Sequence, residues 1–189
     1  MKKVLAALAL SGMVSINVYA SKIESEEKSV QNDFYIALKA LATLGNSIKE
    51  ETTTLEGDMG KGVGVDLGYE LTHGFSIEVD ATYVENSVKE TLANGDSEEF
   101  SASYITTSLD IDYKYHLTHE AALIAKVGYE YEIEKIKGLD INNNETGYIV
   151  AAAVEYEISE HMALLGEYEY TSIVGPRGNG IFAGIVYGF

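Results

Sequence analysis

The segment VGVDLGYEL, residues 63–71, decides how this chain folds. Its odd-numbered positions, from Val63 to Leu71, are apolar or aromatic, whereas its even-numbered positions hold glycines and the carboxylates Asp66 and Glu70. Side chains alternate between two faces along a β-strand, whereas a helix repeats its apolar positions every three or four residues. The segment therefore predicts a strand with one apolar face and one charged face.

The same alternation recurs along most of the chain. The predicted strands are residues 33–44, 63–71, 75–83, 105–117, 121–132, 147–158, 162–171 and 180–189. Most of them are longer than the ~5–6 residues that are usual for strands of globular proteins. The chain is therefore predicted to be all-β, with eight long strands.

The connections between these strands alternate in length. Three are tight turns, at residues 71–74, 117–120 and 158–161. Four are longer polar segments, at residues 45–59, 85–99, 136–146 and 174–179. Short periplasmic turns opposite longer extracellular loops, on an even number of strands, are typical of transmembrane β-barrels. We expect the four longer segments to be exposed loops on the extracellular side.

The fold predicted from these patterns is an eight-stranded antiparallel up-and-down transmembrane β-barrel. Tilted strands of about 9–11 residues cross the hydrocarbon layer, and closure leaves no unpaired strand edge in lipid. The apolar face would then contact lipid and the charged face would line the lumen. The alternative is a secreted soluble ligand-binding barrel with the two faces reversed. Tyrosines gathered towards strand ends, such as Tyr83 and Tyr129, favour the membrane.

The first twenty residues have the layout of a secretory signal peptide. Lys2 and Lys3 precede an apolar stretch, and small residues follow at the predicted cleavage site between Ala20 and Ser21. Residues 21–32 are acidic and predict a disordered lead-in. The predicted organisation is therefore a signal peptide at residues 1–20, the lead-in, and a barrel at residues 33–189.

Charge and composition restrict the partners. The chain has a formal net charge of −17 and no cysteine. So acidic a protein repels polynucleotides, and we expect no nucleic-acid partner. The missing thiols exclude a disulfide framework. No pattern indicates a cofactor, and we expect none.

Alternation also predicts which charged side chains enter the lumen. The predicted lumen charge cluster is Lys39, Asp66, Glu78, Asp80, Asp110, Asp112, Lys114, Lys126, Glu130, Glu155 and Glu167, with Glu70, Glu132, Glu157 and Glu169 on the same faces. The acids far outnumber the bases, which is compatible with a narrow cation-favouring pore. An eight-stranded barrel is only just wide enough for its own side chains, so a packed polar interior without steady conductance is the preferred interpretation.

The sequence gives little support to catalysis or metal binding. The four histidines, His73, His116, His119 and His161, lie in or beside the short turns, without a nucleophile and an orienting acid at suggestive spacing. The segment DINNNETG, from Asp140, begins like a calcium loop but lacks the required glycine at its sixth position. We expect no catalytic residue and no metal site.

The combined pattern resembles the OmpA-like and OmpX-like small outer-membrane β-barrels of the porin-family type. The resemblance rests on the signal peptide, the long alternating strands, the one-sided loops and the final IVYGF. It implies an insertion signal in the last strand, read by the barrel-insertion machinery, formed by Ile181, Ala183, Ile185, Tyr187 and Phe189. It also implies a monomer in contact with outer-membrane lipid and lipopolysaccharide, with both termini in the periplasm.

These observations give two hypotheses for function. The first is a structural or surface-interaction role in the outer membrane, in which the extracellular loops contact a ligand or another surface. The second is a small passive channel that favours cations, because of the acidic lumen. Neither hypothesis involves an enzymatic activity.

Overall fold

The structure is a computed structural model that describes residues 34–49, 52–139 and 141–189. The predicted signal peptide, its cleavage site at Ala20 and Ser21, and the acidic lead-in at residues 21–32 lie outside the described residues. These assignments therefore stay predictions. In the described part of the chain, no helix is long and apolar enough to span a membrane.

The described chain is built from β-strands connected in an up-and-down order. The strands are β1 (Phe34–Thr43), β2 (Ser47–Lys49), β3 (Thr53–Gly57), β4 (Gly60–Glu70), β5 (Phe75–Leu92), β6 (Ser97–His116), β7 (Ala121–Lys137), β8 (Ile141–Ser159), β9 (Met162–Thr171) and β10 (Gly180–Gly188). All strand pairs are antiparallel.

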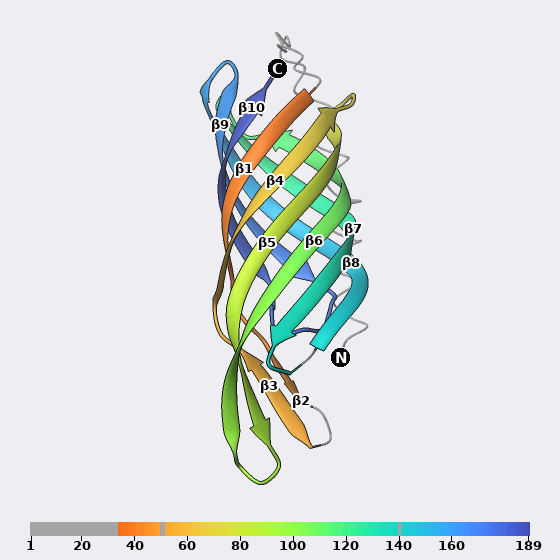
Figure 1. Ribbon diagram of the computed structural model, residues 1–189. Helices are drawn as coiled ribbons and strands as arrows, with labels where there is room; N and C mark the ends of the chain where they lie inside the picture. The colour runs from red at the N-terminus through yellow and green to blue at the C-terminus, as the bar shows by residue number, and fades with distance from the viewer. Residues whose placement is uncertain (1–33, 50–51, 140) are drawn as a thin grey trace. The chain divides into compact units, whose positions relative to one another are not determined.

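The long strands close into a barrel, as Figure 1 shows. Strand β1 pairs with β4 on one side and with β10 on the other, and the remaining neighbours follow in chain order from β4 to β10. The closing ladder runs from Tyr35 opposite Gly188 to Thr43 opposite Gly180. The eight-stranded antiparallel barrel predicted from sequence is therefore confirmed.

The barrel is inside-out compared with a soluble protein. On β4, Leu67 is 59% exposed whereas the neighbouring Asp66 is fully buried. The same alternation holds on β10 and at the residue that follows it, where the predicted insertion signal, Ile181, Ala183, Ile185, Tyr187 and Phe189, is exposed at every position. The outer surface is therefore apolar, which suits a hydrocarbon solvent and not water.

Aromatic side chains form a belt on the outer surface at each end of this apolar zone. At the short-turn end, the ring centroids of Phe34 and Tyr69 lie 4.7 Å apart. At the other end, those of Tyr148 and Tyr170 lie 6.4 Å apart. Tyrosine rings favour the boundary between lipid and water, because one end of the side chain is apolar and the other polar.

Three of the four predicted loops are largely β-structure, which corrects the sequence analysis. The predicted loop at 85–99 continues β5 to Leu92 and β6 from Ser97, and the one at 136–146 is mostly the end of β7 and the start of β8. The predicted loop at 45–59 contains β2 and β3. Beyond the lipid zone both faces of a strand can be polar, so alternation fades although the backbone ladder continues.

These extensions form a sheet that projects beyond the barrel. The short hairpin of β2 and β3 pairs with the outer part of β5, where Thr53 lies opposite Leu92 and Gly57 opposite Val88. Figure 1 shows this hairpin and the β5–β6 hairpin extending from the end opposite the short turns.

The short turns lie at one end of the barrel, together with the start of β1 and the last residue. The amide of Phe189 donates a hydrogen bond to the carbonyl of Phe34 (3.0 Å), and that of Gly188 to His161 (2.9 Å). In the turn before β5, His73 and Gly74 adopt φ values of 63° and 79°. Such left-handed pairs match the twist of a tight hairpin.

Candidate functional site

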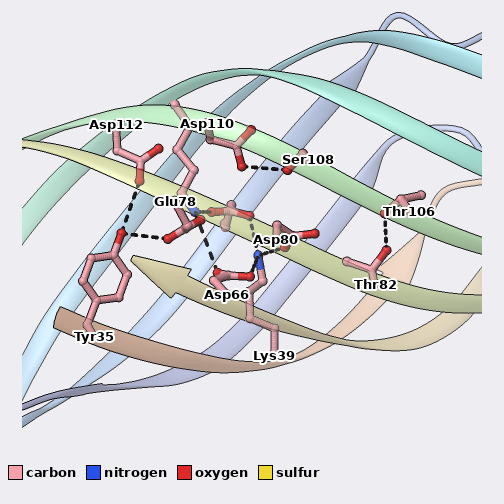
Figure 2. Close-up of polar contacts among 12 residues, drawn as sticks. Tyr35, Lys39, Asp66, Glu78, Asp80, Thr82, Thr106, Ser108, Asp110 and Asp112 are labelled. Atoms are coloured by element: carbon pink, nitrogen blue, oxygen red, sulfur yellow. Dashed lines mark hydrogen bonds and ion pairs between the residues drawn. The ribbon is translucent and has the colours of Figure 1, made fainter. Parts of the chain in front are cut away.

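The centre of the barrel interior holds a cluster of ion pairs built around Lys39 of β1. Its ammonium nitrogen lies 2.8 Å from a carboxylate oxygen of Asp66 and 2.8 Å from one of Asp80. Glu167 lies 3.4 Å away from the same nitrogen. Figure 2 shows Asp66 and Asp80 converging on Lys39 from neighbouring strands.

A second lysine shares carboxylates with the first. The ammonium nitrogen of Lys126 on β7 contacts Glu78 and lies 2.9 Å from Glu167 and 3.9 Å from Asp66. Asp66 and Glu167 therefore contact both lysines. A buried charge is tolerated when opposite charges replace the lost hydration. Because the carboxylates are shared, the two lysines together neutralise part of the charge of four acidic side chains.

Tyr35 extends the network towards the short turns. Its hydroxyl donates hydrogen bonds to Glu78 (2.8 Å) and Asp112 (3.3 Å), as Figure 2 shows. The tyrosine ring lies over Gly68, where a β-carbon would approach the ring to 1.9 Å. The glycine on this strand therefore makes room for the aromatic ring. In the same view, Ser108 donates to Asp110 (2.8 Å).

Lys114 forms a separate pair of contacts nearer the short turns. Its ammonium nitrogen lies 2.9 Å from Glu155 and 3.3 Å from Glu70, and its side chain is half-buried. Glu157, which alternation places in the lumen, is exposed instead. Glu157 still lies in regular register opposite Ala163, but it stands at the open short-turn end of β8, where every residue from Tyr156 to Met162 is exposed.

An apolar layer fills the interior on the long-hairpin side of this cluster. Its buried residues, here called the apolar layer, are Leu41, Val84, Val88, Ala102, Tyr104, Ile136 and Phe182. The ring of Phe182 also meets the charged cluster, because the Lys39 nitrogen lies 4.6 Å from its centroid. An ion that crossed the barrel would leave the charged cluster and meet apolar side chains.

The segment 174–179 folds into the barrel mouth, which corrects its prediction as an exposed loop. Arg177 is only 4% exposed. Its guanidinium donates to both carboxylate oxygens of Glu130 (2.7 and 3.0 Å) and lies 2.6 Å from Glu132. Thr171 also donates to Glu130 (3.0 Å). Arg177 therefore brings a cation into the lumen that strand alternation does not reveal.

The sequence does contain a signal for this segment. Arg177 is the single arginine of the chain, Pro176 is its single proline, and Gly175 and Gly178 flank them. Pro176 restricts the backbone at one residue, whereas the flanking glycines allow a wide range of φ values. A turn that re-enters the barrel needs both properties. The segment has no alternation of apolar and polar residues, so a search for strand periodicity does not detect it.

Backbone contacts hold the inserted segment in place. The amides of Leu44, Gly45 and Asn46 donate to the carbonyls of Asn179, Arg177 and Pro176, at 2.9, 3.1 and 3.1 Å. A β-carbon on Gly57 would come within 2.0 Å of the Pro176 oxygen. Close approach of these two segments therefore depends on glycine.

The charged residues are unevenly balanced. In the part of the chain that the structure describes, the buried acids are Asp66, Glu78, Asp80, Asp110, Asp112, Glu130, Glu132, Glu134, Glu155, Glu167 and Glu169, and the buried bases are Lys39, Lys126 and Arg177. That is eleven acids for three bases. Ten of the eleven residues in the predicted lumen charge cluster are buried, and Lys114 is half-buried.

The histidines occupy the exposed short-turn end, where sequence analysis places them. His73, His116, His119 and His161 are all exposed. Within residues 34–49, 52–139 and 141–189, no group of three or more His, Asp or Glu side chains is arranged to hold a metal ion.

Several solved structures share this barrel. OprG from Pseudomonas aeruginosa superposes with a TM-score of 0.68 and 12% identity, over 82% of this chain and 95% of that chain. Neisserial surface protein A gives 0.61 and 15%, over 83% and 97%. Ail, the attachment invasion locus protein of Yersinia pestis, gives 0.53 and 11%, over 82% and 96%. At these identities the likeness concerns the fold.

Comparison with curated proteins gives no significant match. Comparison with family models gives one that covers residues 6–189, described as the outer membrane protein beta-barrel domain. Together with the inverted faces and the closed ladder, this match assigns the apolar zone to the outer membrane. The chain belongs to the outer membrane protein beta-barrel domain family and is an integral outer-membrane protein.

Proposed function

We propose that this protein is a non-conducting, non-enzymatic barrel that carries a structural or surface-interaction role through its extracellular hairpins. The observation that carries the proposal is the filled interior. The charged cluster around Lys39 is followed by the apolar layer, and Arg177 occupies the extracellular mouth. A water-filled path would need to displace all three.

The projecting sheet supports the surface role. The β5–β6 hairpin and the β2–β3 hairpin extend from the end of the barrel opposite the short turns (Figure 1), and ladders of this length keep their shape more firmly than loops do. Ail was solved in complex with the heparin analogue sucrose octasulfate. A polyanion of that class is disfavoured as a ligand of this chain by its net charge of −17.

The competing function is a cation-favouring channel. The excess of buried carboxylates favours cations over anions, so the choice depends on whether the interior conducts. Purified protein in planar bilayers is expected to show no steady conductance. Robust cation-selective conductance would overturn the proposal and favour the channel.

Hairpin shortening tests the surface role directly. Replacing residues 90–98 by an Asn-Gly turn removes the tip of the β5–β6 hairpin and keeps the pair of Val88 and Phe100. We expect the variant to fold and to insert normally, and cells that carry it to lose adhesion to surfaces that bind the wild type. Unchanged adhesion on every surface tested would contradict a role for this hairpin.

The chain has no cysteine, so single cysteines test the orientation without background. Asn94→Cys, at the hairpin tip, should react with a membrane-impermeant maleimide on intact cells. Thr118→Cys, in a short turn, should react only after the cells are opened. The reverse pattern would invert the topology and place the projecting sheet in the periplasm.

A further inference from the structure

Strand β8 has a free edge in its first part. Its neighbour β9 pairs with it as far as Thr171, which lies opposite Ile149, and the chain then turns into the barrel mouth with segment 174–179. From Ile141 onwards, β8 therefore pairs with β7 on one side and, within the described chain, with no strand on the other. A free strand edge exposes a row of backbone donors and acceptors.

The direction of these free backbone groups follows from Tyr148. Its amide donates to the hydroxyl of Ser172 (2.8 Å), and its carbonyl accepts from the amide of Ser172 (3.0 Å). Both groups of Tyr148 therefore point to the side of β9. Successive residues of an antiparallel strand point these groups to opposite sides, so those of Asn142, Asn144 and Thr146 point the same way as those of Tyr148. These three residues are called the β8 edge.

The β8 edge is accessible. Its three residues are exposed, and their backbone groups form no hydrogen bond to a neighbouring loop among the described residues. Strand β2 is also an end strand of the sheet. A cavity of about 280 Å³ lies between the two strands and is lined by Ile48 of β2 and by Ile141 and Asn143 of β8. The wall of the projecting part is therefore open between β8 and β2.

An extended peptide is the ligand that matches this edge. Amide and carbonyl groups recur along the β8 edge at every second residue, a repeat of about 6.6 Å. Another extended backbone offers complementary groups at the same repeat, and strand addition to a free edge is a general mode of peptide recognition.

The cavity favours particular side chains on the added strand. Every second side chain of such a strand would point towards the cavity, where Leu55, Val174 and Pro176 supply apolar surface and Glu145 supplies a carboxylate. The whole chain has a net charge of −17. A segment with alternating apolar and basic residues therefore complements the edge, whereas an acidic segment is repelled.

A second copy of this chain in the same membrane does not fit the edge. Two copies in one membrane are related by a rotation about the membrane normal, so their β8 strands cross the membrane in the same direction. Because the strands of such barrels are tilted by roughly 35–45°, two facing β8 edges would cross instead of lying alongside each other.

We propose that the β8 edge binds an extended segment of another protein, with alternating apolar and basic side chains, by β-strand addition. This binding rests on the proposed surface-interaction role and names a surface for it. Shortening of the β5–β6 hairpin at residues 90–98 leaves the β8 edge intact, and peptide binding to purified protein does not require cell adhesion. Failure of the edge can therefore be distinguished from failure of the surface role.

The test uses the full protein in zwitterionic lipid nanodiscs and the peptide acetyl-Val-Lys-Val-Lys-Val-Lys-Val-amide. Calorimetry is expected to show saturable binding. The same peptide with N-methylated backbone amides keeps its side chains and charge but loses its donors, and it should bind at least tenfold more weakly. A peptide with glutamate in place of lysine should lose as much. Equal binding of either control peptide would overturn the proposal.

Amide hydrogen exchange locates the bound peptide on the wild-type protein. Without peptide, the amides of Asn142, Asn144 and Thr146 should exchange quickly, whereas those of Asn143 and Glu145, which point to β7, should exchange slowly. The peptide should slow exchange at the three residues of the β8 edge at least tenfold. Unchanged exchange at these three residues would overturn the proposal.

Two variants of one residue separate backbone recognition from side-chain recognition. Asn144→Pro removes a donor on the unpaired side of an edge strand, where proline is tolerated, and we expect it to weaken peptide binding at least tenfold. Asn144→Ser keeps the donor and should bind like the wild type. Equal affinity of the two folded variants would overturn the proposal. Folded mobility in gels shows that each variant is intact, and the exchange measurement on the wild type decides the matter without either variant.

Discussion

The two halves of the barrel interior are filled by different chemistry. On the short-turn side, Lys39 and Lys126 hold several carboxylates within a network of ion pairs. On the long-hairpin side, the apolar layer occupies the lumen and Arg177 enters from a connecting segment to pair with Glu130. The strands are continuous across both halves, so the difference lies in the inward-facing strand residues and in the connecting segment 174–179.

The comparison teaches how a narrow barrel can be closed in two ways. In the charged half, every cation comes from a strand and is fixed by the ladder. In the mouth, the cation comes from segment 174–179, which glycine contacts and backbone hydrogen bonds hold against residues 44–46. We expect the first half to govern stability and the second to govern closure.

Lys126→Met is expected to have the largest effect, because it removes a cation shared by Glu78, Glu167 and Asp66. Breaking a buried ion pair on one side costs about 3–5 kcal/mol. Urea unfolding in detergent micelles should show this loss in the free energy of unfolding. Lys135→Met, at an exposed position of the same strand, is the control. An equal loss of unfolding free energy in the two variants would contradict the expectation that the charged half governs stability.

Arg177→Met should cost somewhat less, about 3 kcal/mol. Water can reach Glu130 and Glu132 once the mouth opens, and their charge is then hydrated. We also expect brief cation-selective openings in planar bilayers, which Lys126→Met should not produce. A silent Arg177→Met variant would mean that the apolar layer alone closes the barrel.

Gly57→Ala probes the same closure without changing charge. Its β-carbon would lie 2.0 Å from the Pro176 oxygen, and forced overpacking of this kind costs about 1–3 kcal/mol. Gly166→Ala, which meets nothing within 4 Å, should stay within about 0.5 kcal/mol of wild type. Equal unfolding midpoints for the two variants would show that segment 174–179 can shift to accommodate the added methyl group without loss of stability.

The smallest effect is expected in the projecting sheet. Lys89 lies opposite Glu99 on the β5–β6 ladder, and Lys89→Glu would place like charges across the pair. Cross-strand charge pairs contribute roughly 0.2–1 kcal/mol. Thermal unfolding should therefore change little, and a change as large as that of Arg177→Met would show that the extension supports the barrel below it.

The sequence by itself determined the architecture. Alternation such as that of residues 63–71 specifies both the strands and the face that each side chain occupies, because the pleat reverses direction at every residue. It therefore also indicated the inward positions of Lys39, Asp66 and Lys126 and the outward row from Ile181 to Phe189. The inward or outward direction of a side chain can be predicted in this way for any residue of a regular strand inside the lipid zone.

Only the tertiary structure decided what happens beyond the lipid zone. In water a strand has no need for an apolar face, so the outer parts of β5 to β8 lack the alternation that marks a strand, and polarity alone suggested loops. The burial of Arg177 depends on contacts between segments more than a hundred residues apart, at Asn46 and Pro176. Contacts of this kind produce no periodic pattern in the sequence, because the two segments come together only when the barrel has closed.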